Sequence, residues 1–389
     1  MLNAAIVGLG MEGLTRAPTA SARTLAARAV LAAAADAGLQ PQEIDGLLVC
    51  RSGGASEAEL GLNLQRAAVL PNLKLLQVSY AEGASSIANI QLAAMAVTHG
   101  LATAVACVFA DAPLANGASS REAFGQRKAA EGLDSLRYTA GLFGGAGIFA
   151  LAASRYIARY GATPEQFGAV AIAARAWARM NPSAVFREPL TLETYLASRW
   201  IAEPLRLYDC ATPVNGAIAV IVTTAERAAD LARPAVHILG MGQGHPGAPD
   251  QAGFEREIGG GGAAAGATAF AMARIGVDDV DLCQFYDAFT YITLNTLEAY
   301  GFCEPGEAGG FVADGRIAPG GALPVNTGGG HLSGFYLQGM TPVSEAVIQL
   351  RGDGGERQCP KTDIALVTNE GGRFDHHACL VLSPHMGRR

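Results

Sequence analysis

One order of elements occurs twice in this sequence, and it limits the folds that the chain can adopt. In the first half, an alanine-rich helix is predicted over 24–37, a glycine at Gly38 ends it, and an acidic link leads to a strand at 46–50. The second half repeats this order, with a helix predicted over 263–274, a glycine, an acidic link and a strand at 280–285. Such a repeat indicates two related units, and alternating strands and helices favour α/β sheets covered on both faces.

We therefore predict two βαβ-type halves with mixed sheets, residues 1–228 and residues 229–389. The stretch 112–200 differs from both halves, because it is rich in arginine and glycine and shows helical patterns near 147–160 and 164–180. We interpret this stretch as an inserted helical loop domain of the first half.

The composition narrows the class of protein. Half of the 389 residues are hydrophobic, and the net charge of −7 argues against a nucleic-acid binder, which needs a basic face. The seven cysteines are dispersed and form no CxxC pair, so we expect a reducing cytoplasm and no metal site. The N-terminus has no signal-peptide pattern. The charge-free run 84–110 breaks at Gly100, which indicates a buried helix and strand rather than a membrane span.

A segment near the N-terminus has the glycine spacing of a dinucleotide-binding motif. A predicted strand at 4–7 runs into Gly8-Leu9-Gly10-Met11-Glu12-Gly13, which has the GxGxxG spacing. However, Pro18 falls where the second turn of the required helix would lie, and residues 14–35 include no acidic side chain to hold a ribose. We interpret the segment as a plain glycine-rich turn and expect no bound NAD.

The clearest local signal for a site lies between residues 280 and 300. An apolar strand at 280–285 ends at Tyr286-Asp287, and a helical run follows from 288 to 300. Open α/β sheets keep ligands and catalytic groups where a strand gives way to a helix. Tyr286 could equally be a packing residue with its hydroxyl at the surface, so its role depends on what else converges on it.

Three further turns are polar or glycine-rich: Tyr80-Ala81-Glu82-Gly83, Asn326-Thr327-Gly328-Gly329-Gly330 with Gly334-Phe335-Tyr336, and Asn369-Glu370-Gly371-Gly372. Together with the Tyr286 turn, they resemble in order the catalytic turns of the thiolases, and within them the sterol-carrier type. Two more segments are similar to signatures of that type: Asp209-Cys210…Pro213…Asn215-Gly216-Ala217 and Gln349-Leu350-Arg351-Gly352. The resemblance covers nearly the whole chain. It implies a thiolase fold, in which two duplicated halves are layered as αβαβα.

The departures from the thiolase pattern bear on the reaction. Tyr80 stands where the nucleophilic cysteine belongs, Tyr336 lies in the turn that should supply the Gly-His-Pro histidine, and Asn369 replaces the last cysteine. An acyl-enzyme needs a thiolate and a base that activates it. A tyrosine, with a pKa of about 10, is no comparable acyl carrier. A standard thiolase reaction is therefore not expected.

The pattern instead resembles the thiolase-like aldolases of steroid side-chain degradation, in which tyrosines at the positions of Tyr286 and Tyr336 are assigned as acid and base. Residues 332–340 are similar to that subgroup. In retro-aldol cleavage of a 3-hydroxyacyl-CoA, a base removes the 3-hydroxyl proton, the C2–C3 bond breaks and a thioester enolate is protonated. We expect a carbon–carbon lyase that acts on a steroid or other bulky thioester and releases a short acyl-CoA and a ketone or aldehyde. Which tyrosine is the acid stays open.

The resemblance also implies supporting residues. Asp287 joins Tyr286 and Tyr336 in the expected catalytic set. The expected substrate and oxyanion pocket contains Tyr80, Glu82, Asn326, Gly329, Gly330, His331, Asn369 and Gly371. Plainer interpretations exist for several of them: Tyr80 fills the volume near the former nucleophile, Asp287 and Glu82 are charges in the first turn of a helix, and the glycines shape a tight loop.

The resemblance further implies a homodimer and a small OB-fold partner protein of the DUF35 type, which carries the zinc ribbon that this chain lacks. Coenzyme A enters only as part of the substrate, and no other cofactor is expected. Two rival functions stay open. One is a thiolase-type acyltransferase, such as an acetyl-CoA acetyltransferase, that uses Cys210 or another thiol. The other is a catalytically silent acyl-CoA-binding subunit of a complex.

Overall fold

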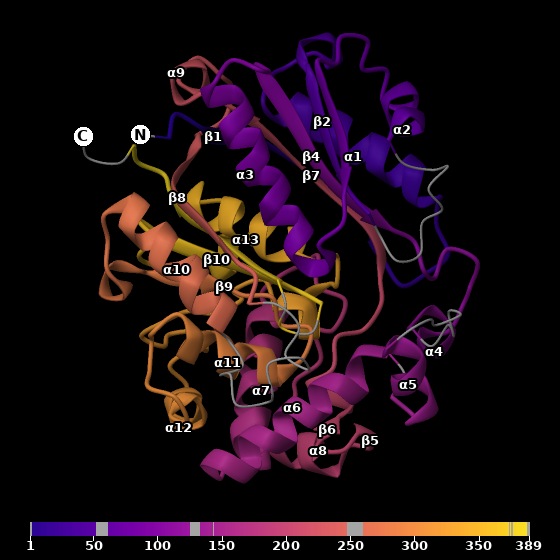
Figure 1. Ribbon diagram of the computed structural model, residues 1–389, viewed down its shortest axis with the longest axis vertical. Helices are drawn as coiled ribbons and strands as arrows, with labels where there is room; N and C mark the ends of the chain where they lie inside the picture. Colours follow the sequence, from indigo (N-terminus) through magenta and orange to yellow (C-terminus); the bar gives the residue numbers. More distant parts are fainter. Residues whose placement is uncertain are drawn as a thin grey trace.

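The computed structural model describes residues 2–51, 61–124, 133–142, 144–246, 260–372, 374 and 376–386. Its main sheet has nine strands in the order β3-β2-β4-β7-β1-β8-β11-β10-β9 (Figure 1). The first five are β3 (Leu75–Ser79), β2 (Gly46–Cys50), β4 (Ala104–Asp111), β7 (Asn215–Thr223) and β1 (Ala5–Thr15). The other four are β8 (Val236–Gly244), β11 (His376–Ser383), β10 (Ala365–Gly371) and β9 (Leu282–Gln284).

The two groups of strands are joined only weakly. The junction is an antiparallel pairing of β1 with β8 at Ala5–His237 and Ile6–Val236. Each group mixes parallel and antiparallel neighbours: β2 runs parallel to β3 and β4, and β9 runs parallel to β10, whereas the β4–β7, β1–β7, β10–β11 and β8–β11 pairs are antiparallel. The predicted mixed sheets are therefore confirmed, as two sheets that meet along one short edge.

The helices form three layers around these sheets. The outer face of the first sheet packs against α1 (Ala22–Asp36), and that of the second packs against α10 (Gly260–Ala273) and α11 (Thr290–Ala299). Between the sheets lie α3 (Ser85–Thr98) and α13 (Met340–Leu350), which contact each other near the centre of the view in Figure 1. This is the expected αβαβα layering of the thiolase fold.

Glycines bring one helix onto each sheet. Gly8 and Gly10 of β1 face α1, and Gly240 and Gly242 of β8 face α10; a Cβ on any of them would stand 2.0–2.1 Å from a helix carbonyl oxygen. The predicted turn at 8–13 is therefore wrong. β1 runs through it to Thr15, paired with β7, because these glycines make room for the helix backbone and do not turn the chain.

The stretch 112–200 is largely helical, as expected. It contains α4 (Ser120–Phe124), α5 (Leu133–Thr139), α6 (Gly144–Tyr160), α7 (Pro164–Arg179) and α8 (Leu192–Ala197). A small hairpin of β5 (Trp200–Ala202) and β6 (Leu205–Arg206) follows, and the group gathers in the lower part of Figure 1. Residues of α6 and α7 share one hydrophobic cluster with α11 and Tyr286. The division of the chain after residue 228 stays a prediction.

Three shorter helices complete the description: α2 (Leu62–Ala67), α9 (Ala225–Ala228) and α12 (Ala308–Ala313). The charge-free run 84–110 forms α3 and β4, as predicted. Across the described ranges, no helix has the length and apolar character needed to cross a bilayer.

Candidate active site

Tyr286 and Tyr336 meet hydroxyl to hydroxyl. Their oxygen atoms are 2.8 Å apart, and their rings stand nearly perpendicular with centroids 6.2 Å apart. Tyr286 follows β9, where its backbone N–H donates to the Thr368 carbonyl of β10. Tyr336 follows a short π-helical turn, Gly330–Gly334, and forms a bridge with Pro213. Segments from distant parts of the chain thus place two phenol groups in direct contact.

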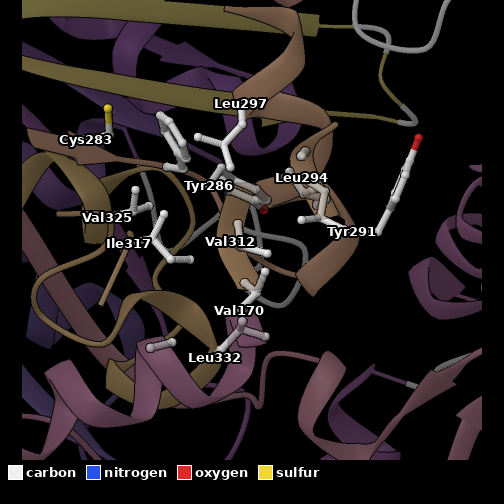
Figure 2. Packing of buried hydrophobic residues seen from close by; sticks show 14 of the residues in the cluster. Val170, Cys283, Tyr286, Tyr291, Leu294, Leu297, Val312, Ile317, Val325 and Leu332 are labelled. Carbon is white, nitrogen blue, oxygen red and sulfur yellow. The ribbon is translucent and has the colours of Figure 1, made fainter. Parts of the chain in front are cut away.

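The Tyr286 ring is enclosed by apolar side chains and one glycine. Figure 2 shows it among residues of the cluster that α7, α11 and the loop before Tyr336 share, including Val170, Leu294 and Leu332. On another side the ring lies against Gly83, where an added Cβ would stand 2.6 Å from the carbon that bears the hydroxyl. The sequence analysis gave Gly83 no role of its own. It did identify the Tyr80-Ala81-Glu82-Gly83 turn, which contains this residue.

Burial makes both phenols weak acids. It raises the pKa of Tyr336 to about 12, although the hydrogen bond from Tyr286 works in the opposite direction and nearby acidic groups add to the rise. Burial also raises the pKa of Tyr286 well above its usual value, and Tyr336 and the carboxylates of Glu370 and Glu82 raise it further. Both hydroxyls are therefore protonated at neutral pH, and their mutual hydrogen bond favours ionisation of Tyr336 over that of Tyr286.

The His331 ring contacts both tyrosine rings. Its ring meets that of Tyr286 edge-on at 4.7 Å and that of Tyr336 at 5.0 Å between centroids. Its Nε2 lies 2.7 Å from the Gln338 carbonyl, and its Nδ1 accepts from the backbone N–H of Asp287 at 3.2 Å. The imidazole is fully buried. Its contacts make it a support for both rings, and the pocket role expected for it stays a prediction.

Asp287 faces the loop before Tyr336. Its Oδ1 accepts from the His331 backbone N–H at 2.7 Å. A Cβ on Gly330 would stand 2.1 Å from its Oδ2, and Gly330 has a φ of 56°. Only glycine fits both the conformation and the contact. The described contacts of Asp287 thus hold the π-helical turn in place.

Asn326 and Gly329 also shape this loop. The Asn326 side chain accepts from the backbone N–H of Phe285 at 2.6 Å, which ties the loop to the residue just before Tyr286. Gly329 has a φ of 92°, and a Cβ on it would stand 2.6 Å from that of Ala178 on α7. The plainer interpretation of these two residues, as builders of a tight loop, therefore agrees with their contacts.

The first turn interlocks with the end of β10. A Cβ on Gly83 would stand 2.0 Å from the Glu370 carbonyl oxygen, and one on Gly371 would stand 2.1 Å from the Ala81 carbonyl oxygen. The Glu82 carboxylate accepts from the backbone N–H of Gly372 at 2.9 Å. Tyr80 is 59% exposed, with the Arg51 guanidinium over its ring. Tyr80 thus lies at the outer end of the turn, while Gly83 contacts Tyr286.

Asn369 is buried next to this interlocked turn. It is 1% exposed, and neither atom of its amide has a hydrogen-bond partner within the described residues. Of the expected pocket residues that we can place, it is the one whose polar side-chain atoms are buried without a partner.

Asp209 is a further organising residue. Its buried carboxylate accepts from the Tyr195 hydroxyl at 2.8 Å and from the Thr290 hydroxyl at 2.6 Å. Its neighbour Cys210 bridges to Phe289. The carboxylate therefore fixes the start of α11, directly after the Tyr286 turn. The Asp209-Cys210 signature marked this segment in the sequence but gave it no role.

The cysteines offer no activated nucleophile. Burial raises the pKa of all seven thiols above the ordinary value. Cys210, the thiol named for the rival acyltransferase, donates to the Arg206 carbonyl. In the part of the chain that the structure describes, no three His, Cys, Asp or Glu side chains gather as metal ligands. The raised pKa values disfavour the thiolate form that acyl transfer needs.

Comparisons with known proteins place the chain among relatives of known activity. Residues 260–384 match the family model of the thiolase C-terminal domain. The chain is 40% identical to a 17-hydroxy-3-oxo-4-pregnene-20-carboxyl-CoA lyase of Mycobacterium tuberculosis, over 90% of this chain and 92% of that one. It is 37% identical to a steroid side-chain-cleaving aldolase of Thermomonospora curvata, over 95% of each. Among solved structures, an Ltp2–ChsH2(DUF35) aldolase superposes with a TM-score of 0.87 and 36% identity over 98% of both chains.

Proposed function

Because the chain belongs to the thiolase superfamily, as a carbon–carbon lyase related to the steroid side-chain-cleaving aldolases, we propose that Tyr286 and Tyr336 carry out its retro-aldol chemistry. The substrate is a 3-hydroxyacyl-CoA with a steroid side chain, of the kind named for the mycobacterial relative. The products are a short acyl-CoA and a ketone. The observation that carries the assignment is the 2.8 Å contact between the two hydroxyls.

The hydrogen bond between the two tyrosines suggests a role for each. It lowers the pKa of Tyr336 and raises that of Tyr286, so the Tyr336 phenolate acts as the base. It takes the 3-hydroxyl proton, the carbonyl forms at C3, and the C2–C3 electron pair moves into the thioester enolate. C2 then takes a proton from Tyr286, and the proton on Tyr336 passes to Tyr286 through their hydrogen bond. The net change moves one proton from the 3-hydroxyl group to C2.

Phenylalanine substitutions test these roles. We expect Tyr286→Phe and Tyr336→Phe each to lower kcat on 17-hydroxy-3-oxo-4-pregnene-20-carboxyl-CoA by about 10²–10⁴-fold, the usual contribution of a positioned acid or base. The matched control is Tyr300→Phe, which removes a buried hydroxyl from the same hydrophobic cluster and is expected to keep the native rate. Cleavage at the native rate by the two site variants would contradict the assignment.

Two assembly proposals accompany this function. The first is a DUF35-type partner, supported by the DUF35 protein named with the structurally similar aldolase. Measuring cleavage with and without such a protein tests it, and failure of the pair to turn over any 3-hydroxyacyl-CoA would favour the silent-subunit alternative. The second is a homodimer, for which the exposed edge of the sheet gives support at β3. We also place the protein in the cytoplasm, in keeping with its free cysteines.

A further inference from the structure

Asn369 lies where three parts of the site meet. It is on β10, one residue after Thr368, whose carbonyl accepts from the Tyr286 backbone. Its amide nitrogen lies against Gly339, three residues after Tyr336, since a Cβ on Gly339 would stand 1.7 Å from it. The same Cβ would stand 2.7 Å from the carbonyl oxygen of Gly83, which contacts the Tyr286 ring. The amide is therefore enclosed by the segments that position both tyrosines.

The amide has no partner there. Both of its polar atoms are buried, and neither forms a hydrogen bond within the described residues. A buried polar group without a partner destabilises the folded protein, so such groups are rare and concentrate where a ligand or water completes them. A hydrophobic side chain of similar size would fold more favourably in this place. The arrangement indicates that the amide receives a partner when the site is occupied.

The chemistry of the reaction supplies that partner. When the C2–C3 bond breaks, negative charge collects on the thioester oxygen, and this oxygen can only accept hydrogen bonds. The Asn369 Nδ2 group is a neutral donor held in a buried position, where a donor stabilises developing charge most effectively. A carboxylate would repel the enolate, and a hydroxyl would supply one donor instead of two.

We propose that Asn369 is a further catalytic residue, whose Nδ2 group donates a hydrogen bond to the thioester oxygen of the acyl-CoA and stabilises the enolate. This inference rests on the proposed lyase function for its substrate class. As the Tyr336 phenolate takes the 3-hydroxyl proton, the electron pair of the breaking C2–C3 bond moves to the C1–C2 bond, and the C1 carbonyl pair moves to the oxygen held by Asn369. Protonation of C2 by Tyr286 returns the pair and restores the thioester.

Kinetics of the full-length protein give the first test. We expect Asn369→Ala and Asn369→Asp to lower kcat by about 10²–10³-fold, the cost of removing one donor to an oxyanion, with KM changed only a few-fold. Gly339→Ala should act in the same direction, because its Cβ would displace the amide while its backbone, with φ of −65°, accepts alanine. A native kcat for Asn369→Ala would overturn the inference.

Binding and stability separate this role from a structural one. Propionyl-CoA and its thioether analogue, S-propyl-CoA, differ at the carbonyl oxygen, and we expect Asn369→Ala to reduce the preference for the thioester by about 2–10-fold. Asn369→Leu should leave Tm unchanged or raise it by about 1–3 °C, since it removes an amide without partners. The control is Asn295→Leu, which removes a buried amide that has an interaction partner and should lower Tm without changing the preference.

Two outcomes would overturn the assignment of Asn369. One is an unchanged thioester preference in Asn369→Ala. The other is a decrease in Tm for Asn369→Leu as large as that for Asn295→Leu. These measurements do not depend on turnover. Suppose that the wild-type protein cleaves no 3-hydroxyacyl-CoA, but that replacing Asn369 by alanine reduces the preference for the thioester. The contact between Asn369 and the thioester oxygen is then supported, and the proposed reaction is contradicted. If the wild-type protein cleaves the substrate and the thioester preference does not depend on Asn369, the proposed reaction is supported and the role of Asn369 is contradicted.

Discussion

The tyrosine pair sets the pH at which the proposed reaction can run. Only a small fraction of Tyr336 is ionised at neutral pH, since burial raises its pKa to about 12. We expect kcat/KM to rise by about tenfold per pH unit between pH 7 and pH 9.5, because the phenolate fraction rises in that proportion below the pKa. A pH–rate profile of the wild-type protein measures this. A flat profile over the same range would exclude the Tyr336 phenolate as the base.

Stability limits the upper end of that assay. Both tyrosines are neutral when buried, whereas an unfolded tyrosine ionises at about pH 10. The native state therefore keeps protons that the unfolded state loses, so the stability contributed by these groups is complete below about pH 10 and falls as the pH rises through the pKa of about 12 for Tyr336. Rates taken below pH 10 thus report on the chemistry alone.

Some of the residue contacts were predictable and others were not. Tyr286 and Tyr336 were paired through their turns, and the structure brings their hydroxyls together. The place of His331 was not predictable, because it depends on a π-helical turn and on a positive φ at Gly330, which no local pattern of residue types announces. The roles expected for the pocket residues stay predictions, with their geometry now specified.

At the scale of elements, glycines in strands decide how closely a helix approaches. We expect Gly240→Ala to lower the free energy of unfolding by about 1–3 kcal/mol, because its Cβ would stand 2.1 Å from the Ala269 carbonyl oxygen and the α10–β8 contact would have to open. The matched control is Gly310→Ala on α12, where an added Cβ meets nothing within 4 Å.

The control should move stability in the opposite direction. Alanine at position 310 is expected to stabilise by about 0.4–1 kcal/mol, since it restricts the unfolded chain and fits the helix. Urea denaturation of both variants measures the two effects. Equal shifts in the two proteins would show that close packing on the sheet is not the reason for Gly240.

Sequence patterns predicted most helices and strands correctly, but they did not predict that strand glycines allow the close approach of a helix. The strand at 46–50 agrees with β2, and the helices near 147–160 and 164–180 appear as α6 and α7. The turn expected at 8–13 failed because a glycine that turns the chain and one that admits a helix look alike in one sequence. The difference lies in a contact with α1, which comes from elsewhere in the chain.

At the scale of the molecule, β3 is an edge strand of the sheet within the described residues. It ends the strand order, and Val78 on it is 47% exposed. An apolar edge favours pairing with another strand, so we expect a homodimer joined at β3. Val78→Lys should convert the dimer to a monomer in light scattering coupled to size exclusion. Leu101→Lys, at an exposed position outside β3, is the control and should leave the dimer intact.

Either of two results would argue against this interface: a wild-type protein that is monomeric at micromolar concentration, or a Val78→Lys variant that remains dimeric. The two-half architecture itself was predictable from the repeated order of elements together with the thiolase-like turns. The joining of the sheets was not, since it rests on a two-residue pairing of β1 with β8 that has no sequence signature.

The hydrogen bond between Tyr286 and Tyr336 also bears on which acyl-CoA molecules compete for the site. The two phenol groups are hydrogen-bonded to each other at 2.8 Å, so we expect the 3-hydroxyl group of a substrate to replace this hydrogen bond when it binds. A thioester without that hydroxyl group cannot replace this hydrogen bond, and we expect Tyr286 and Tyr336 to stay bonded to each other. We therefore expect the hydrogen bond between Tyr286 and Tyr336 to contribute to discrimination against acyl chains that lack the 3-hydroxyl group.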